Sequence, residues 1–180
     1  MEEAAASKRK NLTAHVTHLE MHSPLHRHVA MPSRPRLAVM RTEHMPVAFY
    51  RYLYEQVGKP HHWYLRRVMN DDDLAAIIHS ETTEISVVYA NGSPAGFFEL
   101  DCSQKPDQVE LAYFGLCRDF TGMGFGKWFL ATAIDAAWAH EPKKVTVHTN
   151  TLDHPAALPM YQKLGFEPVG TSEETVTEWR

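Results

Sequence analysis

The chain has 180 residues, of which 44% are hydrophobic and 22% charged, and its formal net charge is −4. This length and balance fit one globular domain, and the negative charge disfavours general binding to a nucleic acid backbone. The two cysteines, Cys102 and Cys117, form neither a metal-type pair nor a disulfide framework, so we expect a reducing compartment. No apolar run approaches the roughly 20 residues that cross a membrane, and the first residues lack the apolar core of a signal peptide. We therefore expect a cytoplasmic protein without a membrane partner.

The first 34 residues predict a segment apart from the main domain. Residues 1–10 read as a tail, residues 12–21 alternate as an extra strand does, and residues 22–35 form a connector broken by three prolines. We therefore assign residues 1–34 to this segment and residues 35–180 to one domain.

The next elements are one strand and two helices with recognisable ends. Residues 36–43 predict a strand, and residues 44–58 predict a helix with Pro46 in its first turn and Gly58 just past its end. Residues 70–80 predict a second helix, capped by Asn70 or Asp71.

The remaining chain predicts a hairpin and then alternating strands and helices. Asn91-Gly92 is a strong signal for a tight turn. The elements in order are a hairpin at 84–101, a strand at 108–117, a glycine loop and helix to about 140, a strand at 143–150, a helix at 154–165 and a last strand at 166–179. This order predicts a mixed α/β sheet with antiparallel hairpins and one parallel crossover around the third helix.

The glycine loop lies in "RDFTGMGFGKWFL", residues 118–130. It stands where a strand ends and a helix begins, so exposed N–H groups and the helix dipole favour an anion there. It is not a P-loop, because no Gly-Lys-Ser/Thr closes it, and its G-x-G-x-G spacing is not the dinucleotide fingerprint. Taken alone, a tight turn with close packing explains it equally well.

Two motifs together resemble one family. "ELAYFGLCRDFTGMGFGKWFLATAI" resembles the acetyl-coenzyme A motif of the GNAT superfamily of N-acetyltransferases, and "HTNTLDHPAALPMYQKLGF" resembles the second motif of that superfamily. The resemblance covers roughly residues 36–176, and most firmly 108–167. It implies a mixed, mostly antiparallel sheet that is splayed at the central strand and flanked by about four helices. The two motifs look like a bacterial-type branch of these enzymes with an unknown acceptor.

The resemblance also implies a cofactor, acetyl-coenzyme A, lying in the splayed sheet. Its pyrophosphate would sit on the backbone N–H groups of the glycine loop, and its pantetheine arm would run beside the 108–117 strand. Where relatives carry Arg or Gln before the loop, this chain has Thr121, and either His154 or Asn150 would contact the pantetheine. The residues implied to bind the cofactor are Phe114, Leu116, Cys117, Arg118, Gly122, Met123, Gly124, Phe125, Gly126, Lys127, Asn150 and His154.

For catalysis the resemblance points to three groups. Tyr161 matches the helix tyrosine that faces the sulfur, although a packed core aromatic is the simpler alternative. The backbone N–H of Leu116 is the expected oxyanion donor. Glu110 is the candidate base, with a surface ion pair as its alternative and Glu99 on the neighbouring strand as its rival. Alternation puts Glu110 and Phe114 on one face unless a bulge intervenes.

The acceptor pocket should come from the first helices and the hairpin. We single out four residues as pocket walls or acceptor contacts, namely Tyr54, Trp63, Tyr64 and Glu99. Three arginines would meet an acceptor carboxylate if they are not simply solvated, namely Arg51, Arg66 and Arg67. The expected acceptor is a small-molecule or peptide amine, and the resemblance leaves a homodimer open.

We expect no metal site. The histidines between residues 15 and 28 fit no regular ligand spacing, and His148 reads more readily as a structural group than as a base. The favoured function is acetyl transfer to a primary amine in a ternary complex, without an acyl-enzyme on Cys117, which lacks a His–acid partner. The alternatives are a non-catalytic module that binds or senses acyl-coenzyme A, and a nucleotide binder.

Overall fold

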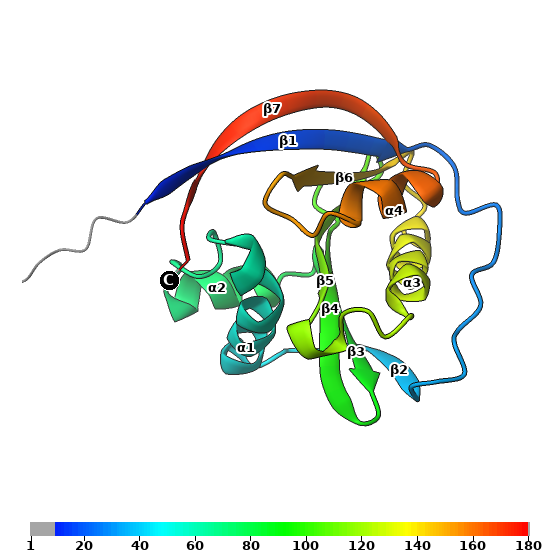
Figure 1. The fold of residues 1–180 in the computed structure, drawn as a ribbon, viewed down its shortest axis with the longest axis horizontal. Coiled ribbons are helices and arrows are strands. Elements are labelled where there is room, and N and C mark those ends of the chain that lie inside the picture. The colour runs from blue at the N-terminus through cyan, green and yellow to red at the C-terminus, as the bar shows by residue number, and fades with distance from the viewer. Residues whose placement is uncertain (1–9, 180) are drawn as a thin grey trace, which may run out of the picture.

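The computed structural model describes residues 10–179, in which seven strands form one sheet (Figure 1). The strands lie side by side in the order β2-β3-β4-β5-β6-β1-β7. β5 and β6 pair in parallel, whereas the other neighbours pair antiparallel. The strands are β1 (Asn11–Met21), β2 (Leu37–Arg41), β3 (Thr83–Ala90), β4 (Ser93–Asp101), β5 (Val109–Leu116), β6 (Val145–Asn150) and β7 (Glu167–Thr177). This confirms the mixed, mostly antiparallel sheet with one parallel crossover.

Helices cover both faces of the sheet (Figure 1). α1 and α2 pack on one face, around a buried cluster that includes Tyr50, Leu53 and Phe97. α3 and α4 pack on the other face, where Phe129 is completely buried. The helices are α1 (Val47–Gly58), α2 (Asp71–Ile78), α3 (Gly126–Trp138) and α4 (Ala157–Lys163), with short 3-10 turns η1 (Lys59–His61) and η2 (Arg118–Phe120).

Local signals in the sequence set several of these boundaries. The Asn70 side chain accepts a hydrogen bond of 2.9 Å from the N–H of Asp73 and caps α2. Asn91 and Gly92 both have positive φ, 51° and 90°, as the tight hairpin turn requires. The helix predicted at residues 44–58 begins three residues later, at Val47, because Pro46 precedes its first turn, and Gly58 is its last residue rather than the residue after it.

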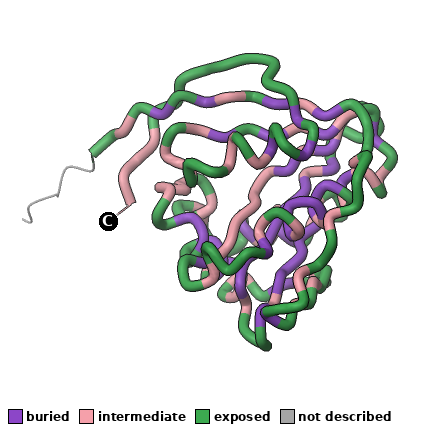
Figure 2. Tube along the Cα trace, turned by 45° about the vertical axis from the view of Figure 1, so that its right-hand side comes forward, coloured by how far each residue is buried: buried purple, intermediate pink, exposed green. Residues whose placement is uncertain are grey.

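The N-terminal strand lies inside the sheet. β1 pairs with both β6 and β7, and its Leu19 and Met21 are buried in the same core as Val147. β1 and β7 together form a curved arm, Asn11–Met21 and Glu167–Thr177, which arches over the molecule towards α1 (Figure 1). Figure 2 shows that the outer strand of this β1–β7 arm is exposed, whereas the central strands are buried. The predicted tail at residues 1–10 lies outside the described residues except for Lys10.

A bulge in β5 changes which side chains share a face. Leu100 pairs with Leu111, but Glu99 pairs with Tyr113, so Ala112 is an extra residue in β5. The bulge therefore places Glu110 on the same face as Tyr113, the face that α1 covers, and it turns Phe114 to the face of α3. The uninterrupted alternation of Glu110, Ala112 and Phe114 does not occur.

Candidate active site

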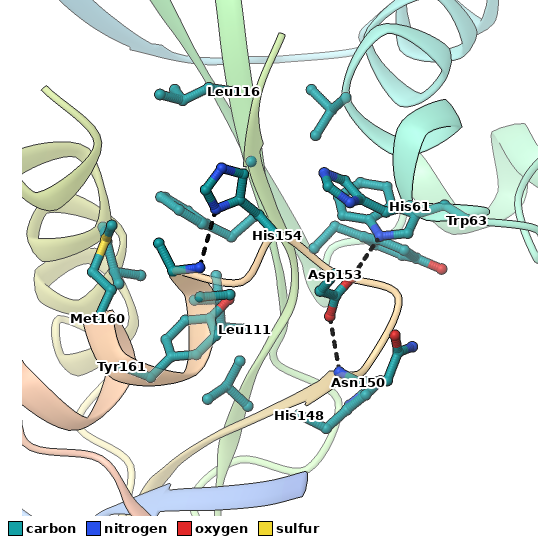
Figure 3. A pocket seen from close by; sticks show the side chains of 18 of the residues that line it. His61, Trp63, Leu111, Leu116, His148, Asn150, Asp153, His154, Met160 and Tyr161 are labelled. Atoms are coloured by element: carbon teal, nitrogen blue, oxygen red, sulfur yellow. Dashed lines mark hydrogen bonds between the residues drawn. The ribbon is translucent and has the colours of Figure 1, made fainter. Parts of the chain in front are cut away.

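A cleft opens where β5 and β6 diverge. The two strands pair only at Val109 with Val145 and at Glu110 with Thr146. Beyond these pairs a cavity of about 590 Å³ lies between the strands. Its walls come from the end of α1, β5, the glycine loop, β6, the start of α4 and β7. Figure 3 shows His154, Met160 and Tyr161 on one side of this cavity and His61 and Trp63 on the other.

The open edge of β5 offers backbone groups to the cleft. The Cys117 N–H donates to the carbonyl of Ala95 at 2.8 Å, so this residue pair is hydrogen-bonded across β4 and β5. Bonded and non-bonded pairs alternate along antiparallel strands. The N–H groups of Phe114 and Leu116 therefore point away from β4, towards the side on which β6 has diverged.

The glycine loop presents free donors at the same end of the cleft. Gly122 and Gly124 have φ of +81° and +88°, and no atom lies within 4 Å of where a Cβ would stand on either. Within residues 10–179, the backbone N–H groups from Gly122 to Phe125 have no hydrogen-bond acceptor. The first N–H groups of α3 also lack partners within the helix. Lys127, exposed in the first turn of α3, lines the cavity beside them.

Tyr161 places a phenol at the cavity. Its side chain is only 6% exposed, it packs against Phe166, and Figure 3 shows its hydroxyl pointing into the cavity. This hydroxyl makes no hydrogen bond to any residue between 10 and 179. Burial raises the pKa of the Tyr161 phenol, so it stays protonated at neutral pH.

A histidine–carboxylate pair stands beside the cavity, in which His148 lines the wall and its partner Glu110 does not. The Nδ1 of His148, on β6, lies 3.2 Å from Oε1 of Glu110, on β5. The hydrogen bond to Glu110 raises the pKa of His148 above its ordinary value of 6.5. Glu110 thus orients the imidazole of His148, a second titratable group. The two side chains are about one-third to one-half exposed.

Asn150 uses both ends of its side-chain amide within the protein. Its Nδ2 donates to Oε1 of Glu174 on β7 at 2.8 Å, and its Oδ1 accepts from the N–H of Leu152 at 2.8 Å. Asn150 therefore fixes the carboxylate of Glu174 at the cavity wall, and its amide keeps a second N–H and a second oxygen lone pair for a further contact.

Asp153 is a cavity residue that sequence reasoning missed. Its carboxylate accepts from the Thr149 hydroxyl at 2.7 Å, from the Asn150 N–H at 3.0 Å and from the Trp63 indole at 3.4 Å. The last contact joins the α1 side of the cleft to the turn after β6 (Figure 3). Asp153 lies within the second quoted motif but has no role assigned in it, and Glu174 lies outside both motifs, so only the folded sheet shows that both line the cavity.

His154 is held in one orientation by the start of α4. Its Nδ1 accepts a hydrogen bond of 3.1 Å from the N–H of Ala156. The neutral ring therefore carries its proton on Nε2, and this edge is turned into the cavity (Figure 3). His154 can thus donate a hydrogen bond from Nε2 into the cavity.

The expected acceptor residues divide into two groups. Tyr54, Trp63 and Tyr64 line the cavity. Glu99 does not, because it is 1% exposed and accepts hydrogen bonds from the Tyr50 hydroxyl at 2.5 Å and from Arg66 at 2.7 Å. This buried pairing leaves Glu99 no exposed carboxylate with which to meet an amine.

The expected cofactor residues also divide. Most line the cavity, but Cys117, Arg118, Met123 and Phe125 do not. Phe125 is completely buried and anchors the loop to the core, and burial raises the pKa of the Cys117 thiol to about 11. A protonated, buried thiol is a poor nucleophile, which agrees with direct attack rather than an acyl-enzyme.

Two further properties of the described chain concern metal ions and membranes. Among residues 10–179, no group of three or more histidine, cysteine or acidic side chains has an arrangement that could hold a metal ion. No helix in this part of the chain has the length and apolar character needed to cross a membrane.

Solved structures share this fold at low identity. A GCN5-related N-acetyltransferase from Kribbella flavida matches with a TM-score of 0.59 and 14% identity, over 93% of this chain and 60% of that one. A tandem GNAT protein from the clavulanic acid biosynthesis pathway matches at 0.61 and 17%, over 96% and 55%. A chimeric spermidine N-acetyltransferase from Vibrio cholerae and hSSAT matches at 0.61 and 16%, over 79% and 95%. The chain thus spans less than two thirds of the first two proteins.

The family comparison agrees with the geometry of the cleft. No curated protein matches the chain. The model of the acetyltransferase (GNAT) family, however, matches residues 40–166, which include β3 to β6, the glycine loop and α4. The splayed strands and the open glycine loop therefore have a common explanation, and the chain belongs to the acetyltransferase (GNAT) family.

Proposed function

We propose that the protein transfers an acetyl group from acetyl-coenzyme A to a primary amine by direct attack within a ternary complex. The observation that carries this proposal is the divergence of β5 from β6 directly beside the unpartnered N–H groups of the glycine loop. Family membership supports an acyltransferase.

The residues present fit the cofactor. Positive φ at Gly122 and Gly124 turns free N–H groups outwards with no side chain in the way, as a pyrophosphate cradle requires. Lys127 adds a positive charge where the usual loop cation is replaced by Thr121. The free edge of β5 at Phe114 and Leu116 can hold an extended amide-containing arm. When bound, acetyl-coenzyme A supplies the activated acetyl thioester.

The amine must lose a proton, and His148 is placed to take it. Its Nδ1–H faces Glu110, so Nε2 is the basic nitrogen. Glu110 fixes the ring and stabilises the imidazolium that forms, as a carboxylate does beside a catalytic histidine. The base is then a pair, in which Glu110 orients His148, and not a carboxylate acting alone.

Two hydrogen-bond donors stabilise the charges that develop during transfer, one at the acyl oxygen and one at the departing sulfur. The N–H of Leu116 points to the cleft, where it stabilises negative charge developing on the acyl oxygen. The Tyr161 hydroxyl is free and protonated, so it donates a hydrogen bond to the departing sulfur. Because its pKa is raised, Tyr161 stabilises the thiolate mainly as a hydrogen-bond donor.

Ligand-dependent stability and turnover test the proposal together. Coenzyme A should raise the melting temperature in a concentration-dependent way, because it binds the folded state. Acetyl-coenzyme A with a panel of primary amines should release free thiol only when an amine is present. Stabilisation by ATP without any by coenzyme A would contradict the assignment, and binding of coenzyme A without turnover on any amine would support a sensing module instead.

A further inference from the structure

Charge is divided between the two ends of the cavity. Apart from histidines, the charged side chains that line it are Lys127, Asp153 and Glu174. Lys127 stands at the glycine loop, on the α3 side. Asp153 lies against Trp63, on the α1 side, and Glu174 joins it from β7. The cavity is therefore positive where the cofactor phosphates would lie and negative at the opposite end.

No lysine or arginine in the described part of the chain neutralises the two carboxylates. Asp153 is held by a hydroxyl, a backbone N–H and an indole, and Glu174 by the Asn150 amide, all of which are neutral donors. Among the described residues, neither forms an ion pair with lysine or arginine. Both carboxylates also raise the pKa of His148, after the hydrogen bond to Glu110 and the attraction of its charge.

The nearby arginines are directed elsewhere. Arg51 pairs with Asp71 at 2.7 Å, Arg66 pairs with Glu99, and Arg67 stacks over the Trp179 ring at 4.4 Å. None of these arginines lines the cavity. A carboxylate on the acceptor would thus meet Asp153 and Glu174 and no guanidinium, and the pocket should repel it.

Aromatic rings complete the negative end. Trp63 lies with its ring centroid 5.0 Å from that of Tyr113 and 5.5 Å from that of Tyr54, and Tyr64 also lines the cavity. Aromatic faces attract cations, and the attraction is stronger where water is excluded. Aromatic rings beside unneutralised carboxylates suit a ligand that carries positive charge.

We propose that the acceptor is an amine with a second, permanently protonated amine and no carboxylate, and that Glu174 selects it. This inference rests on the proposed function. The attacking nitrogen must be neutral when it reacts, so attraction between it and the two carboxylates does not stabilise the transition state. A second ammonium group keeps its charge through the transition state, and its contacts therefore contribute to the rate of capture.

The selecting residue lies outside the part of the chain that the family model covers. Glu174 belongs to β7, beyond residue 166. It pairs with Ala14 of β1 and is fixed by Asn150, so the β1–β7 arm delivers it to the cleft. Specificity for the acceptor then depends on the arm, whereas the cofactor site belongs to the family core.

Three probes of equal chain length separate the charges. 1,4-Diaminobutane, butylamine and 4-aminobutanoate present the same attacking amine, and their far ends are positive, apolar and negative. We expect kcat/KM with acetyl-coenzyme A to fall in that order, by about tenfold at each step, as one charge contact of moderate strength allows. E174Q should reduce the preference for the diamine over butylamine to about threefold or less.

A neighbouring carboxylate provides the matched control. Glu173 is adjacent on β7 but pairs with His15 outside the cavity, so E173Q should keep the wild-type preference. Equal rates with all three probes, or a preference for 4-aminobutanoate, would overturn the inference while acetyl transfer itself stands.

Direct binding covers the case in which turnover is slow. 1,4-Diaminobutane should bind the protein saturated with coenzyme A in a calorimetric titration, and E174Q should weaken this binding. Absence of diamine binding to the coenzyme A complex overturns the inference. Failure of coenzyme A itself to bind counts separately, against the proposed function.

Discussion

The two sides of the cleft are built from different parts of the chain. On the α3 side, the groups proposed to bind the cofactor are mainly backbone N–H groups of the glycine loop and of β5. On the α1 side, they are side chains that come from separate segments, as with Trp63, His148 and Glu174. A backbone site depends on φ and on the absence of side chains, whereas a side-chain site depends on residue identity. We infer that the α3 side still binds its ligand when a side chain is replaced, as at Thr121. Substitutions on the α1 side should instead change which ligand binds there.

The largest expected effect comes from removing His148, the proposed base on the α1 side. H148A should lower kcat/KM by about 10²- to 10⁴-fold, the range for a positioned general base. Affinity for coenzyme A, measured by calorimetry, should stay near wild type, because the α3 side does not use this side chain.

His18 is the matched control for this change. Its ring lies 6.0 Å from that of His148 on the adjacent strand, but it bonds to Ser172 and does not line the cavity. H18A should keep most of the activity. If both variants lose activity equally, the histidine at 148 has a structural role only.

A change at Tyr161 tests a side chain on the cofactor side. Y161F should lower kcat by roughly ten- to a thousandfold, because it removes the donor to the departing sulfur and keeps the ring. Y52F is the control, since Tyr52 is 47% exposed on α1 and does not line the cavity. An unchanged kcat with a confirmed acceptor would assign Tyr161 to packing.

A substitution at one glycine tests whether backbone groups form the binding site on the α3 side. Gly124 has φ of +88°, which costs an L-residue about 1–2 kcal/mol and a β-branched one more. A valine side chain would also occupy the open space in which the pyrophosphate is proposed to lie, so G124V should weaken coenzyme A binding about tenfold or more in calorimetry. Adding T121R to G124V should not restore the affinity, although T121R alone should leave binding equal or tighter.

Gly170 supplies the comparison for that variant. It lies on β7 with no positive φ and no atom within 4 Å of a Cβ, so G170V should bind coenzyme A as wild type does. Wild-type affinity in G124V would mean that the pyrophosphate does not rest on this loop.

The smallest expected effect concerns pH. Glu110 raises the pKa of His148 above 6.5, and the base must be neutral, so the rate should fall as pH drops through that raised value. E110Q removes the charge and lowers this pKa. The acid limb of the kcat/KM profile should then move to lower pH. An unmoved limb would separate Glu110 from the titrating group.

Local signals made much of the fold and the shape of the glycine loop predictable. Asn91-Gly92 identified the hairpin, and the spacing of Gly122, Gly124 and Gly126 identified an open loop before α3, because such residues carry their conformational effect in the sequence itself. The position of β1 between β6 and β7 had no such signal, since pairing between distant strands leaves no local pattern.

The acceptor side was less accessible for the same reason. Glu99 looked like a free carboxylate on a strand, yet Arg66 lies close enough only after the segment following α1 has folded back. The bulge at Ala112 and the meeting of Asn150 with Glu174 likewise depend on register between strands. The pairing of His148 with Glu110 and the place of Glu174 at the cavity were therefore not predictable from the sequence.

The place of β1 in the sheet also affects how the chain is synthesised. β1 leaves the ribosome before any strand that it pairs with, because its neighbours are β6 and β7. Its buried residues, among them Val16 and Leu19, stay without partners until nearly all of the described chain has emerged. Such long-range pairing slows folding and leaves apolar segments exposed to aggregation. The arm that carries Glu174 to the cleft is thus the last part of the sheet to be completed.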